Sequence, residues 1–138
     1  MRVVSFNIRY GIEIDSAVAL LTEHPLLRDV NVLLLQETDE PGTRRIADAL
    51  GMVWVYYPSM RSRITGRDFG NAVLSSWPIV EDEKLVLPHL AVFNRTHRIA
   101  TAATLLVRDS TVRVYSAHLA TVLEACDARR RDQLAAIM

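Results

Sequence analysis

Two polar side chains close short apolar runs in this sequence, where a charged or amide group is unusual. Glu37 ends the run formed by residues 30–36, and Asn7 ends the run formed by residues 2–6. A carboxylate next to so much apolar surface is costly to desolvate unless a cation or a ligand pairs with it. Ligands of α/β proteins bind at the carboxyl ends of strands. The two positions therefore indicate a binding site.

These two residues could bind a hard cation and a phosphate. Mg²⁺ prefers carboxylate oxygen and keeps several waters, so Glu37 and one further group can suffice to hold it beside a phosphate. If the two strands are parallel neighbours, the Asn7 amide could orient a phosphate oxygen or a metal-bound water. The alternatives are a strand-end glutamate that reaches solvent and an ordinary turn asparagine.

Further candidates follow later in the chain. His118 comes directly after the apolar run 111–117, and a neutral-range imidazole can donate to a phosphoryl oxygen or transfer a proton. Asn71 follows Gly70, whose missing side chain permits close backbone approach to a ligand. A half-buried structural histidine and a plain strand-entry glycine are the competing interpretations.

The elements that must position these residues alternate in type. Hydrophobic patterning and turn residues predict α/β layers in the first half of the chain and a run of strands in the second. Asp15 and Thr43 are expected to cap helices, Pro41-Gly42 to form a turn, and residues 59–69 to form a polar loop rich in arginine. The predicted strands are 2–7, 30–37, 53–57, 71–76, 80–87, 99–107 and 111–117, and the predicted helices are 15–24, 43–50 and 123–138, the last still running at the final residue.

Composition sets outer limits on function. The 138 residues suit one compact domain, 1–138, and sixteen basic side chains balance sixteen acidic ones to a net charge of zero. Zero net charge gives no support to nucleic acid as a partner, although a local basic patch stays open. The single Cys126 leaves no intramolecular disulfide. No apolar stretch reaches transmembrane length and no signal peptide is recognisable, so a cytoplasmic protein is expected.

Six segments, in this order along the chain, resemble the endonuclease/exonuclease/phosphatase superfamily, which includes DNase I-like nucleases, sphingomyelinases and inositol polyphosphate phosphatases. The segments are VSFNI at 4–8, VLLLQET at 32–38, GNAVLSSWPI at 70–79, Arg98 before a strand, SAHL at 116–119 with alanine for the usual threonine, and Arg130 with Gln133 on the last helix.

The resemblance implies a fold and a site. The fold class is α/β, the N-terminal half of a DNase I-like four-layer α/β sandwich, in which a mixed β-sheet is flanked by helices and each half of the family fold supplies one sheet. Glu37 would be the principal Mg²⁺ ligand, with Mn²⁺ as the alternative ion, and Asn7 would share the metal site. Glu37, Asn7 and His118 would be catalytic, and Asn71 and Arg98 would bind substrate.

Two family motifs are missing from this sequence. The Gly-Asp-x-Asn turn and the terminal Ser-Asp-His, whose Asp–His pair activates the attacking water, have no counterpart here. The chain therefore looks like a truncated domain, with an incomplete metal site and little or no turnover alone. A sheet face left uncovered by the missing half would be apolar and would favour self-association.

The leading functional prediction is a metal-dependent phosphoesterase that cleaves a phosphodiester or phosphomonoester by water attack. Its partner would be a phosphate-ester substrate, either a polynucleotide or a small or lipid-derived phosphate. The alternative is a non-catalytic binding or assembly module that keeps the half-fold without its chemistry. A generic α/β domain that resembles the family by chance is the third interpretation.

Overall fold

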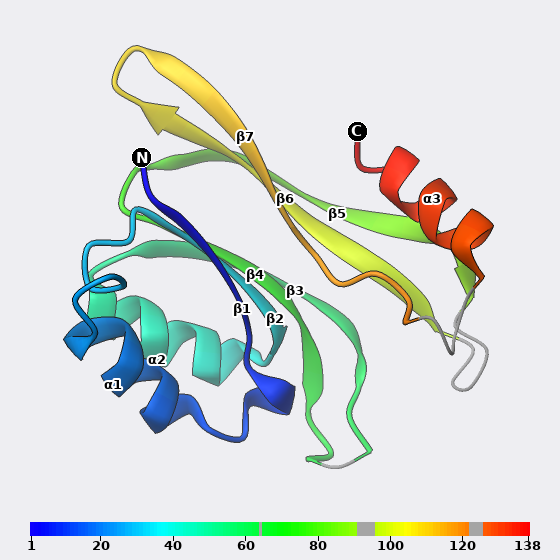
Figure 1. Cartoon of the computed structure of the whole chain (residues 1–138), viewed down its shortest axis with the longest axis horizontal. Helices are drawn as coiled ribbons and strands as arrows, with labels where there is room; N and C mark the ends of the chain where they lie inside the picture. Colours follow the sequence, from blue (N-terminus) through cyan, green and yellow to red (C-terminus); the bar gives the residue numbers. More distant parts are fainter. Residues whose placement is uncertain (64, 91–95, 122–125) are drawn as a thin grey trace.

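The computed structural model describes residues 1–63, 65–90, 96–121 and 126–138. It shows two β-sheets, with two helices against the outer face of the larger sheet and the last helix beside the smaller sheet (Figure 1). The larger sheet has the strand order β1-β2-β4-β3 and the smaller has the order β5-β6-β7. In chain order the elements are β1 (Val3–Asn7), the 3-10 helix η1 (Arg9–Gly11), α1 (Ile14–Glu23), β2 (Val32–Thr38), α2 (Glu40–Leu50), β3 (Val53–Arg61), β4 (Asp68–Ser75), β5 (Ile79–Leu90), β6 (His97–Val107), β7 (Ser110–Ala117) and α3 (Asp127–Ala135).

The parallel pairing of β1 with β2 positions the predicted site. Val3 pairs with Val32 and Asn7 pairs with Gln36, so both strands end at the same edge of the sheet. Parallel neighbours place their last residues together. The condition on which the joint placement of Asn7 and Glu37 rested is therefore met.

The helix-facing side of the larger sheet holds an apolar core. Alternate residues of β2 and β4 point toward α1 and α2, as a period of two requires. Leu33, Leu35 and Leu74 are fully buried there against Leu21 and Ile46 of the two helices. Burial of this face is what fixes the helices on the sheet (Figure 1).

The start of α2 differs from the prediction. Asp39, not Thr43, caps the helix, because its Oδ1 accepts a 2.8 Å hydrogen bond from the Gly42 amide. Pro41 and Gly42 lie inside the first turn and not in a separate turn before it. Proline is well tolerated there because that amide has no partner within the helix. A Cβ on Gly42 would come within 2.6 Å of Ile14 Cδ1 and 2.7 Å of Asp39 Oδ1, so a larger residue would displace these side chains.

Other boundaries also need correction. Asp15 does not cap α1; it lies in the first turn, and its Oδ1 is 2.7 Å from Arg45 Nη2. The bounds expected for the polar loop, 59–69, are wrong, because β3 continues to Arg61 and β4 begins at Asp68. The final helix ends at Ala135 and does not run to the last residue, and its predicted residues 123–125 lie outside the described part of the chain.

The expectation that this chain supplies only one sheet is wrong. The smaller sheet packs on the face of the larger sheet away from the helices, and Val32 and Val73 are buried there against Ala103 and Leu105. The apolar face is thus covered within the chain along this contact, while self-association stays a prediction. Among the described residues, no helix is long and apolar enough to cross a membrane.

Candidate active site

The carboxylate of Glu37 and the amide of Asn7 are in contact at the carboxyl edge of the larger sheet. Asn7 Nδ2 donates to Glu37 Oε1 at 3.2 Å, and Asn7 Oδ1 accepts from the Arg9 amide at 2.9 Å. The second bond fixes the amide so that its NH₂ faces the carboxylate. Side chains from the two strand ends therefore converge on one point, as the sequence predicted.

A β-bulge aims Glu37 at this point. Gln36 pairs with Asn71 and Thr38 pairs with Gly70, so Glu37 is an extra residue with no partner on β4. Its φ of 55° lies in the left-handed region, which is strained for a residue with a side chain. By strict alternation, residue 37 would point toward the helices. The bulge instead directs its carboxylate to the side where Asn7 lies.

His118 reaches the same carboxylate from the other sheet. It directly follows β7, and its Nε2 is 3.8 Å from Glu37 Oε1. The side chains are 24% exposed for His118 and 15% exposed for Glu37, so both groups are largely shielded but open to a ligand. Each sheet thus contributes one ionisable group to the site.

Asn71 and Arg98 line a small hollow together with Glu37 and His118. Four of the five residues predicted for catalysis or substrate binding are therefore neighbours. The amide of Asn71, however, is engaged inside the protein: Nδ2 donates to the Ile99 carbonyl at 2.9 Å and to the Ser116 carbonyl at 3.2 Å. Its predicted contact with substrate stays a prediction.

Gly70 is required by a neighbouring strand. A Cβ at this position would lie 1.9 Å from the Tyr57 carbonyl oxygen and 2.9 Å from Pro58 Cα. The close approach that the sequence suggested is thus an approach of β3 backbone and involves no ligand.

Arg61 and Arg67, from the segment that was expected to be a loop, lie around a different hollow. Arg67 Nη1 is 3.1 Å from Asp39 Oδ2, and Arg61 Nε donates to the Gly66 carbonyl at 2.7 Å. Both line a concavity shared with Trp54 and Tyr56, which belong to the helix-facing core of the sheet. This hollow therefore opens on the helix side, away from the face that carries His118.

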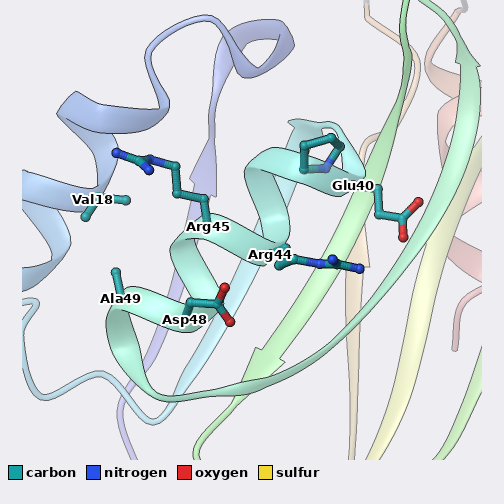
Figure 2. Close-up of a pocket in the computed structure, with 7 residues that line it drawn as sticks. Val18, Glu40, Arg44, Arg45, Asp48 and Ala49 are labelled. Carbon is teal, nitrogen blue, oxygen red and sulfur yellow. The ribbon is translucent and has the colours of Figure 1, made fainter.

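A second concavity lies between α1 and α2 (Figure 2). Glu40, Arg44, Arg45 and Asp48 border it with charges of both signs, and Val18 forms part of its apolar wall. None of the residues predicted to act in catalysis or binding lines it. Its mixed charge gives no preference for an anionic or a cationic ligand.

Several structural roles of polar residues were not predicted. Asp39, 3% exposed, caps α2, but the Asp-Glu-Pro sequence at its start is a recognisable capping signal. Gln133 is 1% exposed and joins α3 to the segment after His118, because its Oε1 accepts from the Ala120 amide at 3.0 Å. An Asp–His pair does exist, between His89 Nε2 and Asp132 Oδ2 at 2.8 Å, and it joins β5 to α3.

The donor atoms at the site suit a hard cation. Glu37 offers carboxylate oxygen, the donor that Mg²⁺ and Mn²⁺ prefer, and one carboxylate can suffice when waters and a substrate phosphate complete the shell. The Asn7 NH₂ group that faces Glu37 can donate to such a water or phosphate oxygen. Within the described ranges, no group of three or more His, Cys, Asp or Glu side chains could hold a metal on its own. The residues therefore fit an ion that shares its ligands with substrate and water.

Comparison with known proteins identifies the family of the chain. A sequence model of the endonuclease/exonuclease/phosphatase family matches residues 4–138. The chain belongs to this family. The three activities in the family's name are hydrolyses of phosphate esters, and such enzymes generally use divalent metal ions. No curated protein matched the chain.

Solved structures share the family fold at low sequence identity. A family protein from Leptotrichia buccalis C-1013-b superposes with a TM-score of 0.72 at 13% identity, over 98% of this chain and 60% of its own. Sphingomyelinase C from Streptomyces griseocarneus gives 0.71 at 18%, over 97% and 54%. The human nocturnin catalytic domain, solved with a bound sulfate anion, gives 0.71 at 20%, over 99% and 56%. This family member thus spans little more than half the length of these relatives.

Proposed function

We propose that this chain carries the metal- and phosphate-binding half of a Mg²⁺-dependent phosphoesterase. The observation that carries the proposal is the convergence of Glu37 with Asn7 at 3.2 Å and with His118 at 3.8 Å, at an edge where two sheets meet. A strained, bulged glutamate is costly to keep, and such strain concentrates at functional sites.

Each residue has a distinct role in this proposal. Glu37 would hold Mg²⁺ or Mn²⁺ directly, and the Asn7 NH₂ group, which faces the carboxylate, would share the site by donating to an oxygen of a metal-bound water or of the phosphate. The ion, when bound, neutralises charge on the phosphoryl oxygens during in-line attack by water. His118 Nε2 donates a hydrogen bond to a phosphoryl oxygen, and Arg98 adds positive charge to the wall of the same hollow.

The isolated chain is expected to bind the ion weakly and to turn over little substrate. One carboxylate stands at the site, and the sequence carries no counterpart of the family's water-activating Ser-Asp-His motif. A longer protein that spans the full length of the solved relatives should show metal-dependent hydrolysis, and its inactivity would count against the enzyme.

Metal binding can be tested directly on the chain. Mn²⁺ binding, followed by electron spin resonance, should weaken roughly tenfold or more in Glu37→Gln. The matched control is Glu23→Gln, because Glu23 is an exposed glutamate at the end of α1. Equal Mn²⁺ affinity in the two variants would refute the site.

A non-catalytic binding module is the second candidate. It is favoured by the absence of a self-sufficient metal cluster among the described residues. Any hydrolysis of bis(4-nitrophenyl) phosphate that is abolished by EDTA and by Glu37→Ala would exclude it. Salt would then separate substrates, since polynucleotide binding weakens steeply with added salt and small-phosphate hydrolysis much less.

A further inference from the structure

Hydrogen bonds join the two sheets directly beneath the candidate site. Asn71 of β4 donates to the Ile99 carbonyl of β6 at 2.9 Å and to the Ser116 carbonyl of β7 at 3.2 Å. In return, Thr101 Oγ1 of β6 donates to the Asn71 carbonyl at 2.9 Å. Asn71 is only 2% exposed, so water cannot replace any bond that is lost.

A second set of bonds lies alongside. Gln36 Nε2 of β2 donates to Ser116 Oγ of β7 at 3.1 Å, and Ser116 Oγ donates to the Leu35 carbonyl at 2.7 Å. Gln36, Asn71, Thr101 and Ser116 are all buried and together form what we name the inter-sheet brace. The brace ties the two inner strands of the larger sheet to the smaller one.

The brace is adjacent in sequence to the two ionisable groups of the site. Glu37 directly follows Gln36 on the larger sheet, and His118 lies two residues after Ser116 on the smaller sheet. The described strands form two separate hydrogen-bonded sheets. The distance between Glu37 and His118 therefore depends on the position of one sheet relative to the other.

Elsewhere between the sheets the contact is apolar. Val32 and Val73 pack against Ala103 and Leu105, and such contacts tolerate small shifts better than hydrogen bonds do. We propose that Asn71 is a positioning residue, which through the inter-sheet brace sets the distance between Glu37 and His118. This inference rests on the proposed function in one respect: it takes Glu37 and His118 to be part of the functional site.

The test measures contact between the pair without metal or activity. In the full chain, Glu37→Gln should shift the His118 ring signals in the NMR spectrum at one fixed pH. In an Asn71→Leu background this shift should be lost, because the Asn71 bonds of the brace are cut while the branched shape of the side chain is kept. In a Val73→Ala background it should persist. Val73 faces the same sheet two residues along β4 and makes no brace bond, so it controls for general destabilisation.

Two results would overturn the proposal. One is an unchanged shift in the Asn71→Leu background, and the other is no effect of Glu37→Gln on His118 in the wild-type chain. If Asn71→Leu does not fold, Asn71→Ala replaces it, since this change removes the donating amide without adding volume; the same loss is expected and its absence overturns the proposal.

A Mn²⁺ measurement separates this inference from the proposed function. In wild type, bound Mn²⁺ should broaden the His118 signals and spare those of His24, which lies near the opposite edge of the sheet, beside the Leu26 carbonyl that accepts from Arg2. Asn71→Leu should weaken Mn²⁺ affinity about tenfold. Wild-type protein that binds no Mn²⁺ but keeps the brace-dependent shift would refute the metal site and support the brace.

Discussion

The two faces of the larger sheet are built on different principles. Toward α1 and α2, the sheet presents leucines that pack against apolar helix residues, with Leu33 and Leu74 fully buried. Toward the smaller sheet, the contact is apolar at one end, around Val73, but changes to buried amides and hydroxyls at the end where Asn71 and Ser116 lie. The change coincides with the carboxyl edge of β1 and β2, where the candidate site lies.

The helix face contributes mainly to the stability of the fold, and the polar end of the other face mainly to the geometry of the candidate site. The helix face gains free energy from area and tolerates many apolar solutions. The polar end of the other face gains less per residue, because hydrogen bonds to water are exchanged for bonds within the protein. Because hydrogen bonds depend on distance and angle, these bonds fix the position of the two sheets relative to each other. The expected effects of mutation therefore differ in size and in kind between the two faces.

The largest effect on stability is expected on the helix face. Leu74, fully buried, can be shortened to test it. Leu74→Ala should lower the free energy of unfolding by about 3 kcal/mol, because it removes a buried side chain and leaves a cavity. Urea denaturation followed by circular dichroism measures this loss. Mn²⁺ affinity at a temperature where the variant is folded should be unchanged; a large loss of affinity would show that the two faces are coupled.

A smaller loss of stability is expected in the brace. Thr101→Val keeps the volume of a fully buried side chain but removes the hydroxyl that donates to the Asn71 carbonyl at 2.9 Å. The change should cost about 1.5 kcal/mol, since a buried acceptor loses its partner.

Comparison of Thr101→Val with Leu74→Ala distinguishes the roles of the two faces, because only Thr101→Val is expected to alter the contact between Glu37 and His118. It should reduce the effect of Glu37→Gln on the His118 ring signals, whereas Leu74→Ala should not. A reduction of equal size in both variants would argue that this contact merely reports overall stability.

The sequence was most informative where chemistry and periodicity coincide. Apolar runs ending in Asn7 and Glu37 located the edge of the sheet correctly, and the parallel pairing that joins them was foreseen as a condition. Motif order identified the family, which the match over residues 4–138 confirms. Strand existence was predicted well because buried strands are continuous in apolar residues.

Other features depend on tertiary contacts and could not be predicted from local patterns. The bulge at Glu37 leaves no local signal, because a left-handed glutamate is unfavourable by itself and is held by its surroundings. The burial of Asn71 between sheets likewise depends on strands far apart in the chain. The strand ends at Arg61 and Asp68 were hidden by polar composition, since β3 and β4 pair beyond their apolar parts.

The strain at Glu37 predicts a gain in stability. Glu37→Gly should raise the free energy of unfolding by about 1 kcal/mol, because glycine adopts a positive φ without steric cost and this outweighs its greater freedom in the unfolded chain. Glu37→Ala removes the same carboxylate but keeps a Cβ, so it should show no such gain. Thermal denaturation of the pair, side by side with Mn²⁺ binding, measures both effects. Equal stability of the two variants would contradict the claim that the backbone of Glu37 is strained.

The smallest effect is expected at Tyr56, on the helix side. Its buried hydroxyl has no hydrogen-bond partner among the described residues. Tyr56→Phe should therefore stabilise the protein by roughly 0.5 kcal/mol at neutral pH, because burying an unpaired hydroxyl is costly. Burial, and next the nearby carboxylates of Asp68, Asp39 and Glu40, raise the pKa of Tyr56 far above its ordinary 10.0.

The raised pKa sets the sign of a pH effect. Below about pH 10 the phenol is neutral in both the folded and the unfolded state, and stability does not depend on it. Above that pH the unfolded chain ionises while the folded chain does not, so stability falls as pH rises. Tyr56→Phe should make this alkaline loss smaller without removing it, because the hydrogen bond to Asp82 also raises the pKa of Tyr57. Urea midpoints measured from about pH 8 to 11 would show the difference, and parallel curves for the two proteins would contradict it.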